Sequence, residues 1–363
     1  MGVDKELAAG LEPGLRFAML ATASGGFVDL TWAGVEAWTP IDGFLWIHLE
    51  RDDPVAQEWV RTRAGLDPLV AMALLADESR PRVEDVDDAL LVVLRGVNKP
   101  RPGEDRPGTV DSELVPIHIW MEAGRCISLR DKDHSLNALR DLRLSMLNGK
   151  GPRSAGGLMA RIAEKVTDHV GDLVDELEEN VSLLEDRLSD ADAGPDLRAA
   201  IADSRRSVVQ VRRYLAPQRD ALYRLRSDDA TWLTDMAKTH LREISDRLIR
   251  HLEDLDEIRQ RASILQEELA AVVAEQTNSN LYTLSVVTVI MLPMTFIAGY
   301  FGMNTGGLPF GLENPYGTLL ASVLIAVTAV LTALILRYGI SFGRYGRVGQ
   351  MRRDNCSDDG GRE

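Results

Sequence analysis

The sequence predicts an α+β cytoplasmic domain, followed by long stalk helices and a two-helix transmembrane hairpin. Two uncharged runs predict the hairpin, because neither Gln276–Leu312 nor Asn314–Leu336 contains Asp, Glu, Lys or Arg. About 20 mostly apolar helical residues are enough to cross a bilayer core. A third observation predicts the stalk: the chain between Thr231 and Pro293 contains no Pro or Gly. With 363 residues, the chain is long enough for a sizeable soluble part besides the hairpin.

Residues 1–150 predict the cytoplasmic α/β domain. Three short runs have the length and the β-rich content of strands: Phe44–Leu49, Ala89–Leu94 and Leu114–Trp120. Between the first two runs, Pro54–Leu75 is expected to form a helix with proline in its first turn.

Residues 151–276 predict a helical bundle and stalk. One helix is expected over Ala155–Leu188, a second from the Gly194-Pro195 breaker to about Arg226, and a third soon after. If the third helix continues to Phe301, it is about 105 Å long at about 1.5 Å per residue. Its apolar residues recur at steps typical of a bundle or coiled-coil face, and we expect this face to continue into the first span. These residues are Leu252, Leu255, Ile258, Ala262, Leu265, Leu269 and Val272.

The remaining boundaries follow from the uncharged runs. The first transmembrane helix is expected over residues 277–302, an outer loop over 303–314, the second transmembrane helix over 315–337, and a basic, then acidic tail over 338–363. The outer loop has no Lys or Arg, whereas the tail has several Arg. The positive-inside rule places such a tail in the cytoplasm. Two spans return the N-terminal domain to the same side, so we expect a multi-pass protein of the plasma (inner) membrane with both termini cytoplasmic.

One face of the first span is partly polar. Steps of three or four place the following residues on one helical face: Asn278, Leu281, Ser285, Thr288, Leu292, Thr295, Gly299 and Met303. Two interpretations are open. Small and hydroxylated residues are common at helix–helix contacts, and the same residues suit the water-facing wall of a pore. In an oligomer both hold, because a pore wall is also a contact face. We call this set the polar stripe.

The span ends in the tripeptide Gly302-Met303-Asn304. Four further residues stand at matching positions before it: Pro293, Thr295, Phe296 and Gly299. With a second span close to the C-terminus, this pattern resembles the first membrane helix and the Gly-Met-Asn signature of the CorA family of divalent-cation transporters. The resemblance implies a CorA-like pentameric funnel, in which the first spans of a homopentamer line the pore and Gly302, Met303 and Asn304 form its selective mouth.

Three stretches resemble the zinc-transport branch of that family, typified by ZntB: Asp77–Arg82, Leu94–Asn98 and the loop Thr305–Pro309. The resemblance implies Zn²⁺ as the transported cation. A channel-like transporter of the same superfamily for Mg²⁺, or for Co²⁺ or Ni²⁺, is the alternative.

The chemistry of the polar stripe does not choose between these cations. The stripe offers amide and hydroxyl oxygens but no carboxylate, His or Cys. Mg²⁺ loses its water ligands reluctantly, and Zn²⁺ prefers nitrogen and sulfur ligands in closed sites. The stripe therefore fits a hydrated or partly hydrated dication. The first span has no Asp, Glu or His, so it does not support proton coupling.

Asn304 has two interpretations. A ring of Asn304 side chains presents one amide oxygen per subunit, which hydrogen-bonds the water shell of an arriving dication, and Glu313 of the outer loop adds negative potential. Alternatively, Asn304 caps the helix end, because Asn tolerates the left-handed conformation found there. The family resemblance favours the ion-facing role.

Metal ligands are not assigned in the soluble part. Its six histidines form no HxxxH or Cys-His cluster, although a composite zinc site built by several subunits stays open; they are His48, His118, His134, His169, His240 and His251. The acidic run on the stalk is interleaved with Arg, which favours a solvated or ion-paired face over a metal-sensing site; it comprises Glu253, Asp254, Asp256, Glu257, Glu267 and Glu268. We expect no cofactor besides the transported divalent cation (Zn²⁺ or Mg²⁺).

Composition excludes two classes of protein. The net charge is −15, and the chain has no basic patch of the kind that nucleic acid requires. It has no nucleophile–base constellation, phosphate loop or metal triad, so an enzyme is not expected. A membrane-anchored coiled-coil scaffold or sensor explains the stalk and hairpin but not the polar stripe ending in Gly-Met-Asn. The expected partners are further copies of this chain in a homo-oligomer, a pentamer by the family resemblance, together with the lipid bilayer and divalent cations.

Overall fold

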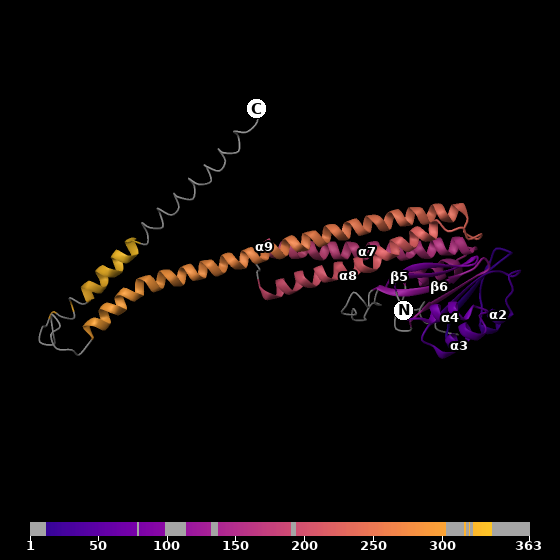
Figure 1. The fold of residues 1–363 in the computed structure, drawn as a ribbon, viewed down its shortest axis with the longest axis horizontal. Helices are drawn as coiled ribbons and strands as arrows, with labels where there is room; N and C mark the ends of the chain where they lie inside the picture. Colours follow the sequence, from indigo (N-terminus) through magenta and orange to yellow (C-terminus); the bar gives the residue numbers. More distant parts are fainter. Residues whose placement is uncertain are drawn as a thin grey trace, which may run out of the picture. The chain divides into compact units, whose positions relative to one another are not determined.

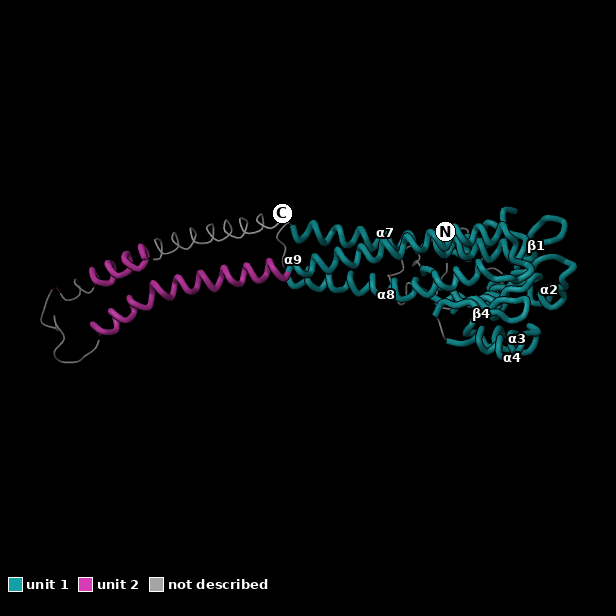
Figure 2. Tube along the Cα trace, turned by 45° about the horizontal axis from the view of Figure 1, so that its top comes forward, with its two compact units in different colours: residues 1–269 teal, residues 270–363 magenta. Residues whose placement is uncertain are grey.

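The computed structural model describes residues 12–77, 80–98, 114–131, 137–189, 194–302, 316, 319 and 322–335. Its ribbon is shown in Figure 1. The chain divides into two compact units, residues 1–269 and residues 270–363, which Figure 2 shows in different colours.

Unit 1 contains a seven-stranded sheet with the order β2-β1-β3-β7-β6-β5-β4. The strands are β1 (Leu15–Thr22), β2 (Phe27–Asp29), β3 (Gly43–Glu50), β4 (Arg82–Val86), β5 (Ala89–Val97), β6 (Leu114–Met121) and β7 (Arg125–Arg130). The central pair β3 and β7 is parallel, and the other neighbouring strands are antiparallel. The three runs predicted as strands lie in β3, β5 and β6.

Helices cover both faces of the sheet. Along β3, Leu45 and Ile47 contribute to an apolar cluster with residues of α2 (Trp32–Ala37), α3 (Pro54–Thr62) and α4 (Pro68–Leu75). Trp46 between them contributes to a larger cluster on the opposite face, with residues of α6 (Asn137–Leu147) and the helical bundle. Successive strand side chains point to opposite faces, so one buried strand supplies two cores.

The single helix predicted over Pro54–Leu75 is wrong, because the structure has two helices there, α3 and α4. Gly65 between them has a φ of +64°, a conformation that ends a right-handed helix. Pro68 then starts α4, whose first turn is capped by the Asp67 side chain accepting from the Leu69 N–H. A proline is tolerated at a helix start but not in its interior.

Three long helices form the bundle: α7 (Ala155–Ser189), α8 (Pro195–Arg226) and α9 (Asp235–Phe301). Polar contacts set their directions. Arg247 of α9 pairs with Asp168 of α7, and Arg261 of α9 pairs with Glu185 of α7. The residue numbers increase in the same direction along both helices, so α7 and α9 are parallel. In contrast, Arg205 of α8 contacts Gln266 and Arg212 contacts Asp256, so α8 is antiparallel to α9.

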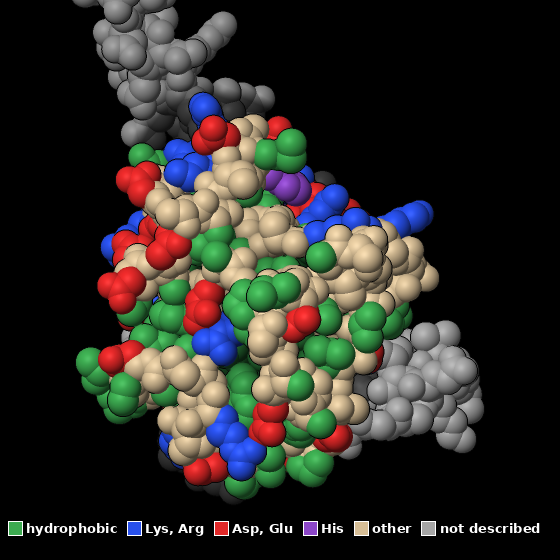
Figure 3. Space-filling model, turned by 90° about the vertical axis from the view of Figure 1, so that its right-hand side faces the viewer, with side chains coloured by type: hydrophobic (Ala, Val, Ile, Leu, Met, Phe, Trp, Pro, Cys, Tyr) green, Lys and Arg blue, Asp and Glu red, His purple; other side chains and the backbone are tan. Residues whose placement is uncertain are grey.

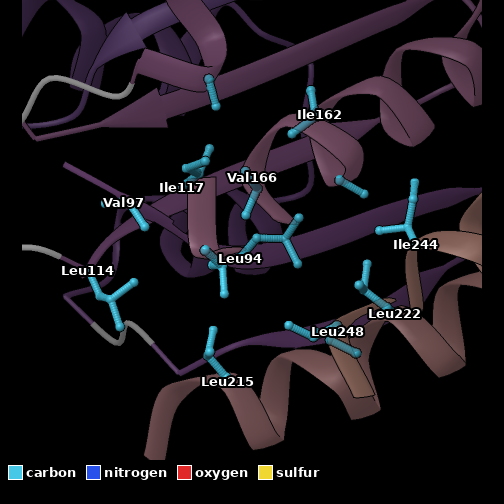
Figure 4. Close-up of a cluster of buried hydrophobic side chains, with 14 of the residues drawn as sticks. Leu94, Val97, Leu114, Ile117, Ile162, Val166, Leu215, Leu222, Ile244 and Leu248 are labelled. Carbon is cyan, nitrogen blue, oxygen red and sulfur yellow. The ribbon is translucent and has the colours of Figure 1, made fainter. Parts of the chain in front are cut away.

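The bundle and the sheet share one apolar core (Figure 4). Residues of the strands, of α7, of α8 and of α9 converge there, among them Leu94, Ile117, Val166, Leu222 and Leu248. Because burying apolar area is the main stabilising term in folding, this shared core explains why unit 1 includes both parts.

The apolar face predicted on the stalk lies in the bundle core. Six of its residues are buried, and Val272 is half-buried. The polar stripe begins at Asn278, in unit 2, and the expectation that the apolar face continues into it stays a prediction.

The backbone conformation at Gly43 favours glycine at this position of the sheet. At the start of β3 it has a φ of +127°, and a Cβ there would lie 2.1 Å from the Ala21 carbonyl oxygen. Because strain and a backbone clash add, Gly43→Ala should lower the free energy of unfolding by about 3 kcal/mol. Gly65→Ala is the control: φ is also positive, yet no atom lies within 4 Å, so about 1 kcal/mol is expected. Denaturant unfolding of both variants measures this, and equal losses would contradict the analysis.

Candidate pore-lining site

The candidate site lies on the C-terminal part of α9, in unit 2. This part contains an 18-residue window with a mean hydropathy of 2.0, none of which is buried within the chain. By length and composition, α9 is the one helix among the described residues that is both long and apolar enough to cross a membrane. α9 runs through Pro293 without interruption to Phe301, and a shorter apolar helix, Ser322–Ile335, lies in the second predicted span.

The polar stripe is exposed along its described length. All seven of its described members have exposed side chains or, for glycine, an exposed surface, from Asn278 to Gly299. Within one chain nothing in the described residues covers them. A helix face that carries amide and hydroxyl groups and has no partner is suited to contact water or another copy.

The hydroxyl groups of the stripe share one hydrogen-bond pattern. Ser285, Thr288 and Thr295 each donate to the backbone carbonyl four residues earlier, at 2.8 Å. A hydroxyl has one donor and two acceptor lone pairs. Since the donor is used within the helix, the oxygen is left to accept from the outside. The stripe thus presents acceptors, which suit the water ligands of a cation because those waters donate outward.

Sequence reasoning missed one member of this face, Thr277. It lies four residues before Leu281, and its hydroxyl donates to the Val273 carbonyl oxygen at 2.8 Å, as in the other hydroxyl residues. The four-residue spacing between Thr277 and Leu281 could have placed Thr277 on this face from the sequence. With Thr277 the row of hydroxyl acceptors begins about two turns before Ser285.

The predicted pore mouth is only partly described. The Gly302 N–H donates to the Ala298 carbonyl oxygen at 3.0 Å, so the helical hydrogen bonding reaches the first residue of the signature. A Cβ at Gly302 would lie 3.1 Å from that same oxygen, which is a tight contact that glycine avoids. Met303, Asn304 and Glu313 lie outside the described residues, so their roles stay predictions.

The motif Leu94–Asn98 joins the sheet to the bundle. Arg95 is buried in β5; its backbone N–H donates to Gln218 of α8 at 2.7 Å, and its guanidinium lies 3.7 Å from the ring centre of Tyr214. The stretch Asp77–Arg82 also makes structural contacts. The Asp77 carboxylate accepts from Arg51, and Arg51 is also paired with Asp131. Both motifs therefore hold elements together in this structure.

His48 and His118 are buried in the sheet, where burial lowers the pKa of both, that of His118 to about 4. The His48 Nδ1 lies 2.9 Å from the Ser128 hydroxyl. On the bundle, His240 faces Glu164 at 3.5 Å. In the described part of the chain, no group of three or more His, Cys, Asp or Glu side chains is placed to hold a metal ion.

Charged side chains on the soluble unit are mixed. Figure 3 shows acidic and basic groups interspersed with apolar ones on one end of the molecule. On the acidic run of the stalk, Asp256 pairs with Arg212 at 2.8 Å and with Arg259 at 3.7 Å. These contacts agree with the ion-paired interpretation of that run.

Comparison with known proteins identifies related chains. The family described as "CorA-like Mg2+ transporter protein" matches residues 42–338. A protein described as divalent cation transporter CmaX, from Pseudomonas aeruginosa, is 36% identical over 295 residues, covering 81% of this chain and 86% of that protein. A zinc transport protein ZntB from Yersinia pestis is 32% identical over 322 residues, covering 88% and 94%.

Solved structures have the same fold. The full-length CmaX structure matches with a TM-score of 0.75 and 34% identity, covering 91% of this chain and 99% of that chain. The CorA magnesium transporter of Methanocaldococcus jannaschii matches with a TM-score of 0.73, covering 88% and 96%. Its identity of 19% makes it a likeness of fold alone.

Cysteine accessibility tests whether the stripe faces water. In intact membranes, Thr288→Cys should react with a charged, membrane-impermeant thiol reagent, because its side chain lies on the stripe. Val287→Cys is the control, since one step of about 100° takes it off that face. We expect at least about fivefold faster labelling at position 288, as thiolate reactivity requires water. Equal labelling at both positions would show that the stripe is not a water-facing wall.

Proposed function

The chain belongs to the CorA-like Mg²⁺ transporter family, and from this premise we propose that it moves divalent metal cations, Zn²⁺ foremost, through a membrane pore. The pore is lined by the first span of a homo-oligomer. One observation carries the proposal: the row of hydroxyl oxygens on α9 whose donors are all occupied by the helix backbone.

Such a pore requires several copies. One helix cannot enclose a channel, whereas a ring of α9 spans, each turning its stripe inward, produces a continuous lining of acceptors. A homopentamer is proposed, with the second span outside the first and the termini in the cytoplasm, as the distribution of Arg along the chain indicates.

The lining suits a cation that keeps its water shell. Water bound to a dication donates its protons outward, and the hydroxyl oxygens of Ser285, Thr288 and Thr295 accept them. The stripe carries no carboxylate or imidazole that would hold the ion tightly, and conduction requires binding weak enough to release. At the mouth, Asn304 amides would add further acceptors, with Glu313 supplying negative potential.

Zinc is favoured over magnesium by the curated relatives. Proteins named zinc transport protein ZntB are 32–33% identical to this chain over most of its length. The lining chemistry is compatible with either ion, so Mg²⁺ remains the alternative cargo. A scaffold without transport would have no use for an unpartnered acceptor row inside a membrane, where unsatisfied polar groups are costly.

Uptake of radioactive zinc into proteoliposomes tests the proposal. Purified full-length protein should give saturable ⁶⁵Zn²⁺ uptake above that of empty liposomes, and an equal concentration of Mg²⁺ should reduce it only weakly. Strong competition by Mg²⁺ would assign the chain to magnesium. Uptake equal to that of empty liposomes would leave a scaffold or sensor as the function.

Asn304 provides a sharper test of the pore mouth. Glycine is the preferred residue at a left-handed helix cap, so Asn304→Gly preserves a cap while it deletes the amide. If Asn304 faces the ion, zinc uptake should fall at least about tenfold, equal to about 1.4 kcal/mol, while oligomer size and thermal stability stay near wild type. The measurements are the same ⁶⁵Zn²⁺ assay and a melting curve in detergent.

Asn304→Asp is the matched control, because it keeps an acceptor oxygen at the same position. It should retain more uptake than Asn304→Gly. Normal uptake by Asn304→Gly would reduce Asn304 to a structural cap.

A further inference from the structure

Two helices of the bundle carry opposite charge. α8 contains eight Arg against three Asp, although the chain as a whole has a net charge of −15. α7 contains nine Asp or Glu against three Lys or Arg. The excess charge is therefore divided between two neighbouring helices, positive on α8 and negative on α7.

The basic residues of α8 follow a strict period. Arg recurs at every seventh position: Arg198, Arg205, Arg212, Arg219 and Arg226. A seven-residue step keeps side chains on nearly one side of a helix, about 10.5 Å apart at about 1.5 Å per residue. Arg206 lies beside this row and is also exposed. We call these six residues the arginine face.

Contacts within the chain use only part of the arginine face. Arg205 and Arg212 reach across to α9. Among the described residues, Arg206 pairs with Asp203 and Arg219 with Asp220, both within α8, and exposed pairs of this kind contribute little to stability. Arg198 forms no ion pair with any described residue.

The acidic residues of α7 have the same period. Asp172, Glu179 and Asp186 are separated by seven positions each, and all three are exposed. We call them the acidic face. Glu179 and Asp186 form no ion pair with α8 of the same chain among the described residues. The rows on the two helices thus have opposite charge and equal spacing.

An exposed apolar residue lies within each row. Leu183 of α7 follows Glu179 by four positions and precedes Asp186 by three, and its side chain is 54% exposed. Val209 of α8 lies three positions from both Arg206 and Arg212, and it is 48% exposed. An apolar centre with a charged rim is the usual composition of a protein interface.

We infer that the arginine face of α8 docks on the acidic face of α7 in a second copy of this chain. The inference rests on the oligomer of the proposed function and names a contact that closes it. A ring of identical subunits needs a heterologous interface, in which two different patches of each copy are complementary. The two rows supply such a pair.

The helix directions fit this contact. In a ring with its axis along the stalk, every α7 points the same way, and α8 is antiparallel to it, so α8 meets the neighbouring α7 as an antiparallel pair. Rows with a seven-residue period stay in register along such a pair when the helices cross at about 20°. An anionic lipid or nucleic acid would match the arginine face alone and would not account for the acidic row of equal spacing on α7.

Crosslinking between two differently marked chains tests the inference. We would co-express tagged Leu183→Cys with untagged Val209→Cys, both in full-length protein carrying Cys356→Ser; Cys126 is buried and stays. A short bismaleimide should then join tagged to untagged chains in membranes. Any such product is intersubunit by construction. Chains that both carry Leu183→Cys should not be joined, and a product between them would indicate an isologous contact and overturn the inference.

Charge reversal shows whether the rows hold the contact. Glu179→Arg with Asp186→Arg in the tagged chain should lower the crosslinking yield about fivefold, equal to about 1 kcal/mol, because two exposed ion pairs, each of them weak, are lost. When Val209 faces Leu183 in an antiparallel pair, Arg206 and Arg212 lie opposite Asp186 and Glu179, so Arg206→Glu with Arg212→Glu in the other chain should restore at least about half of the yield. Arg61→Glu with Lys150→Glu changes the charge equally at exposed sites outside the bundle and should restore none.

The outcomes separate this inference from the proposed function. If the oligomer takes up zinc but gives no crosslink, the docking contact alone is overturned. The same holds if the crosslink forms with a yield that charge reversal does not change. A protein that is monomeric in detergent and inactive in liposomes overturns the pore itself.

Discussion

The hydrogen bond from each stripe hydroxyl to the carbonyl four residues earlier is the interaction on which the proposed ion pathway depends. It satisfies the only side-chain donor that Ser and Thr carry, so these side chains can lie in a membrane span without an unsatisfied hydrogen. It also fixes the direction in which the oxygen accepts. In the proposed pore, a cation that keeps its waters would meet a row of acceptors that does not strip those waters away.

The second constraint is the change in environment along α9. Apolar residues up to Leu269 are buried in the bundle core, whereas the stripe residues from Asn278 to Gly299 are exposed. In the described part of the chain nothing covers the proposed pore lining, which is what a lining shared by several copies requires.

Structural roles account for features that looked like functional signatures. Arg95 stands in a motif that resembles the zinc-transport branch, yet its contacts are to Gln218, Tyr214 and Leu114. Burial of an arginine requires that its donors be satisfied, and a helix from more than a hundred positions away supplies part of this. A family resemblance can thus be carried by residues that hold the domain together and lie outside the proposed ion pathway.

The sequence by itself determined the features whose physics is local. The uncharged spans, the helical period of the stripe, the breaker before α8 and the strand-length runs depend on neighbouring residues alone. Gly65 and Pro68, which divide the predicted helix, are local signals that the sequence contained. Only the tertiary structure decided that α8 runs antiparallel to α9 and that Arg95 is tied to α8. These outcomes depend on contacts between distant positions, because which side chains become buried together is settled by packing and not by the local pattern.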